Sequence, residues 1–494
     1  MSELSFQRRF RRQLVRLQAR LEAGTGDRWI PPVVALLLSA VLTSLSVARV
    51  RGVDAGIDLA GYAQALWLLG EGKLPQASLF GDGVHLLGVH WSFVVYPLAL
   101  PAKLASTATV LVVAQSIALG LGVIPLWRLA RRVANVRVGA SVALVVAYAF
   151  YPAVHELALD DFHPEAFAVP GLIAMVYLGA VKNWVGYWAC VMFVLACRAD
   201  LGLAVALWGF VLLSEGKRRP GLWTIGVGTF WALGLLLVVQ PVLSGSVVRQ
   251  YGTYGDSLGE AIIQMVTHPI ELLSDLTSQS NVTILVGLLA PVIFLPLLSL
   301  RHLAPALPLG ALYLVTADGD AAFSERYGLL TAFVFIASTF ALARLGTMGV
   351  DRVFVDIRLL LSLVAASILL FINDAPSSPY SEPWSWSEQT ATDRSITEAV
   401  ALLTSDDAVR TTPSAVAPLA ERSWLHVLDT SQQPQILSAV YQVRAVLIVE
   451  DDLPPLPDDD RVIQRESFDA GMRTQGYDLI YSDVTNGVLL YYRP

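Results

Sequence analysis

The stretch from Tyr151 to Pro170, YPAVHELALDDFHPEAFAVP, concentrates groups that could do chemistry between two apolar runs. Carboxylate oxygens and imidazole nitrogens are ligands that Mg²⁺, Mn²⁺ or Zn²⁺ accept, so Asp160, Asp161 and His163, with Glu165 beside them, could bind a substrate or a divalent cation. The alternative is a solvated connector between two membrane helices. A short connector does not need the six ionisable groups that fall within the eleven residues 155–165: His155, Glu156, Asp160, Asp161, His163 and Glu165.

A second group of candidates follows the first long apolar run, where a membrane helix would meet water. Asp54 and Asp58 lie there, and an aspartate in that place can act as a general base towards a hydroxyl or amine. Asp58 also precedes LAGYAQALWLL, which has the pattern of an amphipathic helix, so it could instead be a helix N-cap. Spacing alone favours the cap. Further on, His85 and His90, with Asp82, are weaker candidates for a cation.

Two arginines suit a phosphate or pyrophosphate, because a guanidinium presents paired donors. Arg198 lies with Asp200 in CRADLGL, within apolar sequence, where charged side chains usually face a cavity or a partner. Arg326 lies in SERYG, between two other apolar runs. Loop-closing ion pairs, Arg198 with Asp200 and Arg326 with Glu325, are the alternative, although a paired arginine can still bind phosphate.

The elements that must position these residues are membrane helices. The chain of 494 residues is 55% hydrophobic and only 15% charged, against about 25% charged in soluble domains. We therefore predict an all-α polytopic membrane protein with about eleven transmembrane helices between residues 29 and 373. The expected spans are 30–50, 107–127, 138–153, 166–181, 184–197, 200–213, 222–243, 283–300, 303–317, 327–345 and 358–373.

The distribution of basic residues sets the expected orientation. Residues 1–28 read as a cytoplasmic, basic amphipathic segment, and threading the spans from there places the main basic clusters inside. This holds if the stretch 91–104, broken by Pro97 and Pro101, lies along the outer face without crossing. The chain is then a multi-pass protein of a bacterial cytoplasmic membrane, and the candidate residues face outwards. The basic residues placed inside are Arg128, Arg131, Arg132, Arg137, Lys182, Lys217, Arg218, Arg219, Arg301, Arg344, Arg352 and Arg358.

The sequence after about residue 373 changes character. A Pro-, Ser- and Trp-rich linker leads into short apolar strands alternating with one or two helices, which predicts a small extracytoplasmic α/β domain over residues 374–494. The stretch DDLPPLPDDD carries five aspartates in ten residues, and such acidity argues against nucleic acid or anionic headgroups as partners of this domain. The chain contains no nucleotide-binding or HExxH metalloprotease motif.

Several stretches, taken in order, give a resemblance to a known family. GIDLAGYAQALWLLGEGKLP, LLGVHWSFVVYPLALPAKL, ALDDFHPEAFAVPGLIAMVYL, CRADLGLAVALWGFVLL and ERYGLLTAFVFIA, with the tail SDDAVRTTPSAVAPLAERSWLHVLD, resemble the domain of unknown function 2079 family of predicted bacterial membrane proteins. That family is similar to the GT-C glycosyltransferases, which use polyprenyl-phosphate-linked sugars on the outer side of the membrane. The resemblance implies a GT-C-like fold.

The same resemblance implies roles for single residues. The acidic residue that acts as a base or metal contact in the first outer loop of GT-C enzymes corresponds to Asp58. Ala63 and Val89 stand where related chains often carry carboxylates, which weakens a metal site in this loop, whereas His90 is retained. In CRADLG, an arginine takes the place of an acidic residue and the following aspartate persists.

These expectations combine into one hypothesis. The chain would transfer a sugar from a polyprenyl-phosphate donor to a cell-envelope glycan or protein, with Asp58 as the base and the donor phosphate near Arg198 or Arg326. His90, Asp160, Asp161, His163, Glu165 and Asp200 would contact substrate or a Mg²⁺ or Mn²⁺ ion. The alternative is a non-catalytic membrane protein that binds or transports a lipid-linked or anionic molecule. A third reading is an assembly subunit that docks through the acidic tail.

Overall fold

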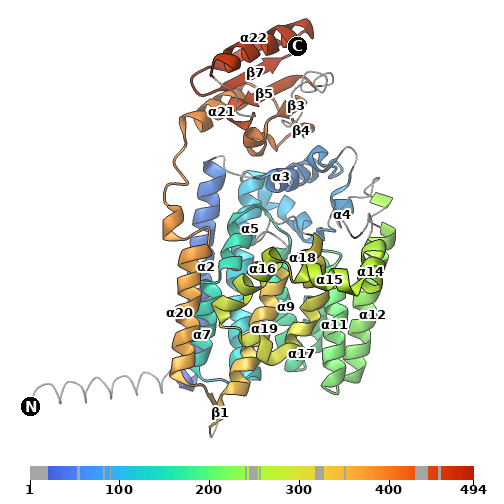
Figure 1. Cartoon of the computed structure of the whole chain (residues 1–494), viewed down its shortest axis with the longest axis vertical. Coiled ribbons are helices and arrows are strands. Elements are labelled where there is room, and N and C mark those ends of the chain that lie inside the picture. The colour runs from blue at the N-terminus through green and yellow to red at the C-terminus, as the bar shows by residue number, and fades with distance from the viewer. Residues whose placement is uncertain are drawn as a thin grey trace, which may run out of the picture.

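The computed structural model describes residues 21–52, 56–81, 84–89, 91–239, 242–243, 254, 258–316, 328–349, 352–428, 443–453 and 458–494. Up to Asp374 these residues form a helical bundle, and the remainder forms a mixed sheet at one end of it (Figure 1). Most of the expected basic segment 1–28 lies outside the described residues. The described part of it begins with a π-helical turn, Leu21–Thr25.

Among the described residues, the helices that are long and apolar enough to cross a membrane are Gly26–Arg51 (α2), Thr107–Val133 and Ile357–Ser381, by length and composition. The second comprises α5 (Thr107–Leu121), α6 (Val123–Arg128) and a π-helical turn, and the third begins with α20 (Ile357–Asp374). Two bent pairs raise the number to five if each is one span: Val138–Ala149 (α7) with Pro152–Leu159 (α8), and Gln279–Val292 with Leu295–Ala311. The count of about eleven stays a prediction.

Shorter helices make up the second bent pair and the rest of the bundle. They are α3 (Ile57–Gly70), α4 (Leu86–Val89), α9 (Glu165–Ala180), α10 (Trp184–Leu195), α11 (Leu201–Ser214), α12 (Arg218–Gly234), α14 (Leu258–Thr267), α15 (Pro269–Leu276), α16 (Gln279–Leu289), α17 (Leu300–Leu303), α18 (Leu307–Thr316) and α19 (Gly328–Leu345). The stretch expected to lie along the outer face forms two short 3₁₀ helices, Phe93–Ala99 and Pro101–Lys103.

Small residues allow the helices to pack closely. A Cβ on Gly202 of α11 would lie 2.7 Å from the carbonyl oxygen of Gly228 on α12, and one on Gly228 would lie 2.5 Å from the backbone nitrogen of Ala206. Backbones therefore approach where no side chain intervenes, as is common between membrane helices.

The basic residues predicted to face the cytoplasm gather at the end of the bundle opposite the sheet. The hairpin of β1 (Thr347–Met348) and β2 (Val353–Phe354) protrudes there (Figure 1). Beside it, a guanidinium nitrogen of Arg352 donates to the carbonyl oxygen of Arg131. Arg301 lies near Glu215, with 3.6 Å between the charged groups. The geometry thus separates the basic end from the sheet end, while the side each faces stays a prediction.

Beyond the bundle, five strands form one sheet in the order β4-β3-β5-β7-β6. Strands β4, β3 and β5 are parallel, while β7 runs antiparallel to β5 and β6. The neighbouring strands β5 and β7 consist of apolar and tyrosine residues, and Ala445–Val449 is buried throughout. The elements are α21 (Ala391–Ala401), β3 (Val409–Thr411), β4 (Leu425–Val427), β5 (Ala445–Val449), α22 (Asp458–Thr474), β6 (Asp478–Asp483) and β7 (Val488–Tyr492).

Candidate active site at the start of helix α3

Helix α3 lies across the sheet end of the bundle, and its first turn is capped from another part of the chain (Figure 1). The carboxylate of Asp161 accepts hydrogen bonds from the backbone nitrogens of Asp58, at 3.2 Å, and Leu59, at 2.6 Å. The first amides of a helix have no partner within it, so a carboxylate placed there satisfies them and faces the positive end of the helix dipole. The structure thus brings Asp161 to the start of the helix that carries Asp58.

The capping contact depends on a glycine. Gly56 is the N-cap of α3, and no side chain within the helix supplies a capping hydrogen bond. A Cβ on Gly56 would lie 2.1 Å from Oδ2 of Asp161, so any larger residue would push the carboxylate away.

Two properties expected of this helix are wrong. Asp58 is in the first turn and is not the N-cap, because the helix begins at Ile57, two residues earlier than a cap at Asp58 would require. The helix is also not amphipathic, since every residue from Leu59 to Leu66 is buried. The sheet region covers the face that would otherwise meet water, as the contacts below show.

A buried glutamine holds the segment that supplies the cap. Gln115 of α5 has a fully buried side chain, and its Nε2 donates to the carbonyl oxygens of Leu157 and Asp161, both at 2.8 Å. Its Oε1 accepts from the backbone nitrogen of His163 at 2.6 Å. One amide side chain therefore fixes both sides of the turn that carries the capping carboxylate.

An aromatic contact also connects this turn to α3. Phe162 is buried, and its ring packs edge-on against Tyr62 of α3 with centroids 5.0 Å apart. The turn and the helix are therefore locked together by packing as well as by hydrogen bonds, so the backbone of Asp58 has a defined place at the sheet end of the bundle.

The proposed cation ligands do not assemble. Within the described part of the chain, no group of three His, Cys, Asp or Glu side chains could hold a metal ion. Asp160 is exposed, whereas His163 is buried and Asp161 receives three backbone amides, the third from Phe162. The candidates Asp160, Asp161 and His163 therefore do not form a three-ligand group in the described residues, because their side chains occupy different environments.

A second cluster begins four residues after the cap. Glu165, at the start of α9, is buried and bonds the guanidinium of Arg198. Nε of Arg198 lies 3.0 Å from Oδ2 of Asp200, to which the hydroxyl of Tyr313 also donates. The ion pair expected between Arg198 and Asp200 is therefore present, and the cluster holds two carboxylates for one guanidinium.

This cluster has one open acceptor. Oδ1 of Asp200 is buried and has no hydrogen-bond partner among the described residues. Buried carboxylate oxygens are rarely left unbonded, since an unmet acceptor costs about 1–3 kcal/mol or more. A hydroxyl or amine of a ligand would satisfy it. Because Arg198 is already balanced by carboxylates, it is a weaker phosphate site than the sequence suggested.

Four candidates fall outside the described residues: Asp54, Asp82, His90 and Arg326. Their expected roles stay predictions.

The sheet region contacts α3 and its surroundings through the start of β4 and the residues just before it. The hydroxyl of Ser78 donates to the carbonyl oxygen of Leu425 at 2.8 Å and accepts from its nitrogen at 2.9 Å. Gln64 of α3 donates to the carbonyl oxygen of Arg422 at 3.2 Å. Glu421 accepts from the backbone nitrogen of Thr107, 2.7 Å away, at the start of α5. The tail is therefore part of the environment of this site.

Sequence reasoning missed Gln115 and Tyr313. Each is distant in sequence from the groups it bonds, so no local motif includes it. A signal for Gln115 did exist, since a polar side chain inside the apolar run VLVVAQSIALGL is unusual and commonly functional. Tyr313 has no comparable signal, because tyrosine is ordinary in membrane helices.

The arrangement defines a class: a polytopic membrane protein whose bundle carries a carboxylate-rich site beneath a small mixed sheet. Its fold resembles that of ArnT from Cupriavidus metallidurans. The ArnT structure bound to undecaprenyl phosphate superposes with a TM-score of 0.53 and 12% identity, covering 93% of this chain and 97% of that one. The apo structure of ArnT superposes with a TM-score of 0.53 and 12% identity, covering 95% of this chain and 98% of that one.

The chain belongs to the DUF2079 family of predicted membrane proteins, whose sequence profile matches residues 53–490. No curated protein matches it in sequence. At 12% identity, the likeness to ArnT shows the fold alone.

Proposed function

We propose that this chain is a membrane glycosyltransferase that moves a sugar from a polyprenyl-phosphate donor to an acceptor on the extracytoplasmic side. The observation that carries the proposal is the position of Asp58, held at the start of α3 by Asp161 in a chain with the fold of a protein that binds undecaprenyl phosphate. Asp58 is half-buried, so its carboxylate keeps access to a ligand.

Each residue of the site has a separate role in this proposal. Asp58 acts as the general base that takes the proton of the acceptor hydroxyl, while the sugar leaves its phosphate. Asp161 is a positioning residue that fixes the turn carrying this base. Asp200 accepts a hydrogen bond from a sugar hydroxyl through its open Oδ1. Of the two arginines considered for the phosphate, Arg326 is preferred, because Glu165 and Asp200 engage Arg198.

The test is sugar transfer by the purified chain in vesicles supplied with a panel of labelled polyprenyl-phosphate sugars. Asp58→Asn keeps the size of the side chain and removes the base, so transfer should fall by about 10²–10⁴-fold with expression unchanged. Asp54→Asn is the matched control and should cost much less.

Two results would count against the proposal. Full transfer by Asp58→Asn would show that Asp58 is not the base. Binding of the lipid-linked sugar without transfer for any donor would favour the non-catalytic alternative, a protein that binds or carries such a lipid.

A further inference from the structure

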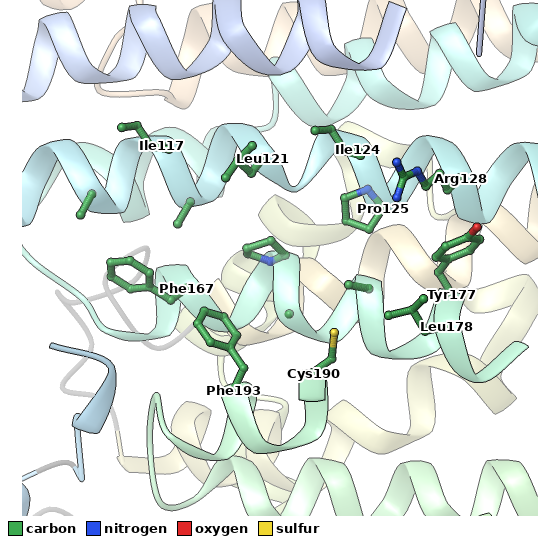
Figure 2. A pocket seen from close by; sticks show the side chains of 15 residues that line it. Ile117, Leu121, Ile124, Pro125, Arg128, Phe167, Tyr177, Leu178, Cys190 and Phe193 are labelled. Carbon is green, nitrogen blue, oxygen red and sulfur yellow. The ribbon is translucent and has the colours of Figure 1, made fainter. Parts of the chain in front are cut away.

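A groove of about 650 Å³ runs along the bundle between α5 and α6 on one side and α9 and α10 on the other. Figure 2 shows Phe167 and Phe193 near one end and Arg128 and Tyr177 near the other. From the level of Ala114 to that of Arg128 the groove extends about 21 Å along the helix axis. This exceeds half of the ~30 Å hydrocarbon core, so one chain of a lipid can lie in it along its whole length.

The lining of the groove is apolar except at one end. Ile117, Leu121 and Phe193 are partly exposed in it, and Arg128 is the one charged lining residue among those described. That end is the basic end of the bundle, opposite the sheet. The groove therefore combines an apolar channel with a cation at its mouth.

The three arginines near this mouth, Arg128, Arg131 and Arg132, differ in whether a carboxylate balances their charge. Arg131 is buried and bonds Asp27 and Glu22, so its charge is balanced. Arg128 and Arg132 are exposed and, within the described residues, neither pairs with a carboxylate. Arg132 instead donates to the hydroxyl of Tyr177 at 3.1 Å, which turns its guanidinium towards the groove mouth.

We propose that this groove binds an anionic phospholipid of the cytoplasmic leaflet, with the phosphate at Arg128 and Arg132 and one acyl chain between α6, α9 and α10. Charge complementarity selects this occupant, because basic pockets between membrane helices on the cytoplasmic side recognise anionic headgroups. The positive-inside distribution places this mouth in that leaflet. The site lies at the opposite end of the bundle from Asp58, so the proposal does not rest on the proposed function.

Native mass spectrometry of the delipidated full chain tests the proposal by titration with phosphatidylglycerol or with phosphatidylcholine of the same acyl chains. Phosphatidylglycerol should bind more tightly. Arg128→Gln and Arg132→Gln should each weaken its binding roughly fivefold, which corresponds to the contribution of one basic residue near an anionic surface. Arg358→Gln is the matched control, an exposed arginine at the same end of the bundle but on α20, and should leave binding unchanged.

A second variant separates the chain from the headgroup. Ala174→Phe fills the middle of the groove and leaves both arginines in place, so it should weaken both lipids together. Melting temperatures equal to wild type establish that each variant is folded. The proposal is overturned if phosphatidylcholine binds as tightly as phosphatidylglycerol, or if Arg128→Gln and Arg358→Gln behave alike. It is also overturned if polyprenyl phosphate displaces the phospholipid one for one, since the groove would then belong to that lipid.

Discussion

Removal of the carboxylate at Asp161 should loosen the start of α3 and leave the rest of the bundle in place. In Asp161→Ala, the backbone nitrogens of Asp58 and Leu59 lose their acceptor, and the charge facing the helix dipole is lost. Loss of a cap costs about 0.5–2 kcal/mol, and a charge at a helix N-terminus contributes about 0.3–1 kcal/mol. The local opening free energy of the first turn should therefore fall by about 1–3 kcal/mol.

Hydrogen–deuterium exchange of the full chain in detergent measures this change directly. A decrease of about 1–2 kcal/mol in the local opening free energy corresponds to an increase of roughly 5–30-fold in the exchange rate of the first amides of α3. Asp160→Ala is the matched control, because Asp160 is exposed and the hydrogen bonds to the helix start are made by Asp161. Gly56→Ala should reproduce the effect by displacing the carboxylate. The reasoning is refuted if α3 exchanges equally fast in the Asp161 and Asp160 variants.

Three further predictions concern the supports of the site. Gln115→Leu should lower the melting temperature and raise hydrogen–deuterium exchange across residues 157–163, because each buried backbone group that loses its partner costs about 1–3 kcal/mol. Unchanged exchange there would show that Gln115 does not hold this turn. Glu421→Gln should weaken the bond to Thr107 and speed limited proteolysis near residue 421, whereas equal cleavage would show that this contact does not hold the sheet. Burial raises the pKa of Asp407, but the amide and hydroxyl of Thr404, the hydroxyl of Tyr492 and the charge of Arg444 together lower it below its usual value. The ionised carboxylate therefore stabilises the sheet fully above about pH 4, and this stabilisation is lost as the pH falls through the folded pKa. Pepsin should then cut the sheet faster towards pH 3. Asp407→Asn should reduce this dependence of the cleavage rate on pH.

Much of the membrane architecture follows from local sequence. Runs of apolar residues define α2, α5 with α6, and α20 close to the predicted spans, because a helix in hydrocarbon must be apolar along its whole length. The alternation of basic loops also anticipates that Arg128, Arg301 and Arg352 share one end of the bundle. The apolar strands after residue 400 were likewise readable, since buried strands such as Ala445–Val449 are continuous apolar runs.

The candidate site depends on contacts that the sequence does not encode locally. Sequence placed Asp58 at a helix start but offered no means to see that Asp161, about a hundred residues later, would supply the cap, or that Gln115 would hold that turn. Hydrogen bonds of this kind depend on where three separate segments meet, which packing of the whole bundle decides. The sequence also predicted a water-facing side for α3. The structure shows instead that the sheet region covers this helix, for example where Gln64 bonds the carbonyl oxygen of Arg422.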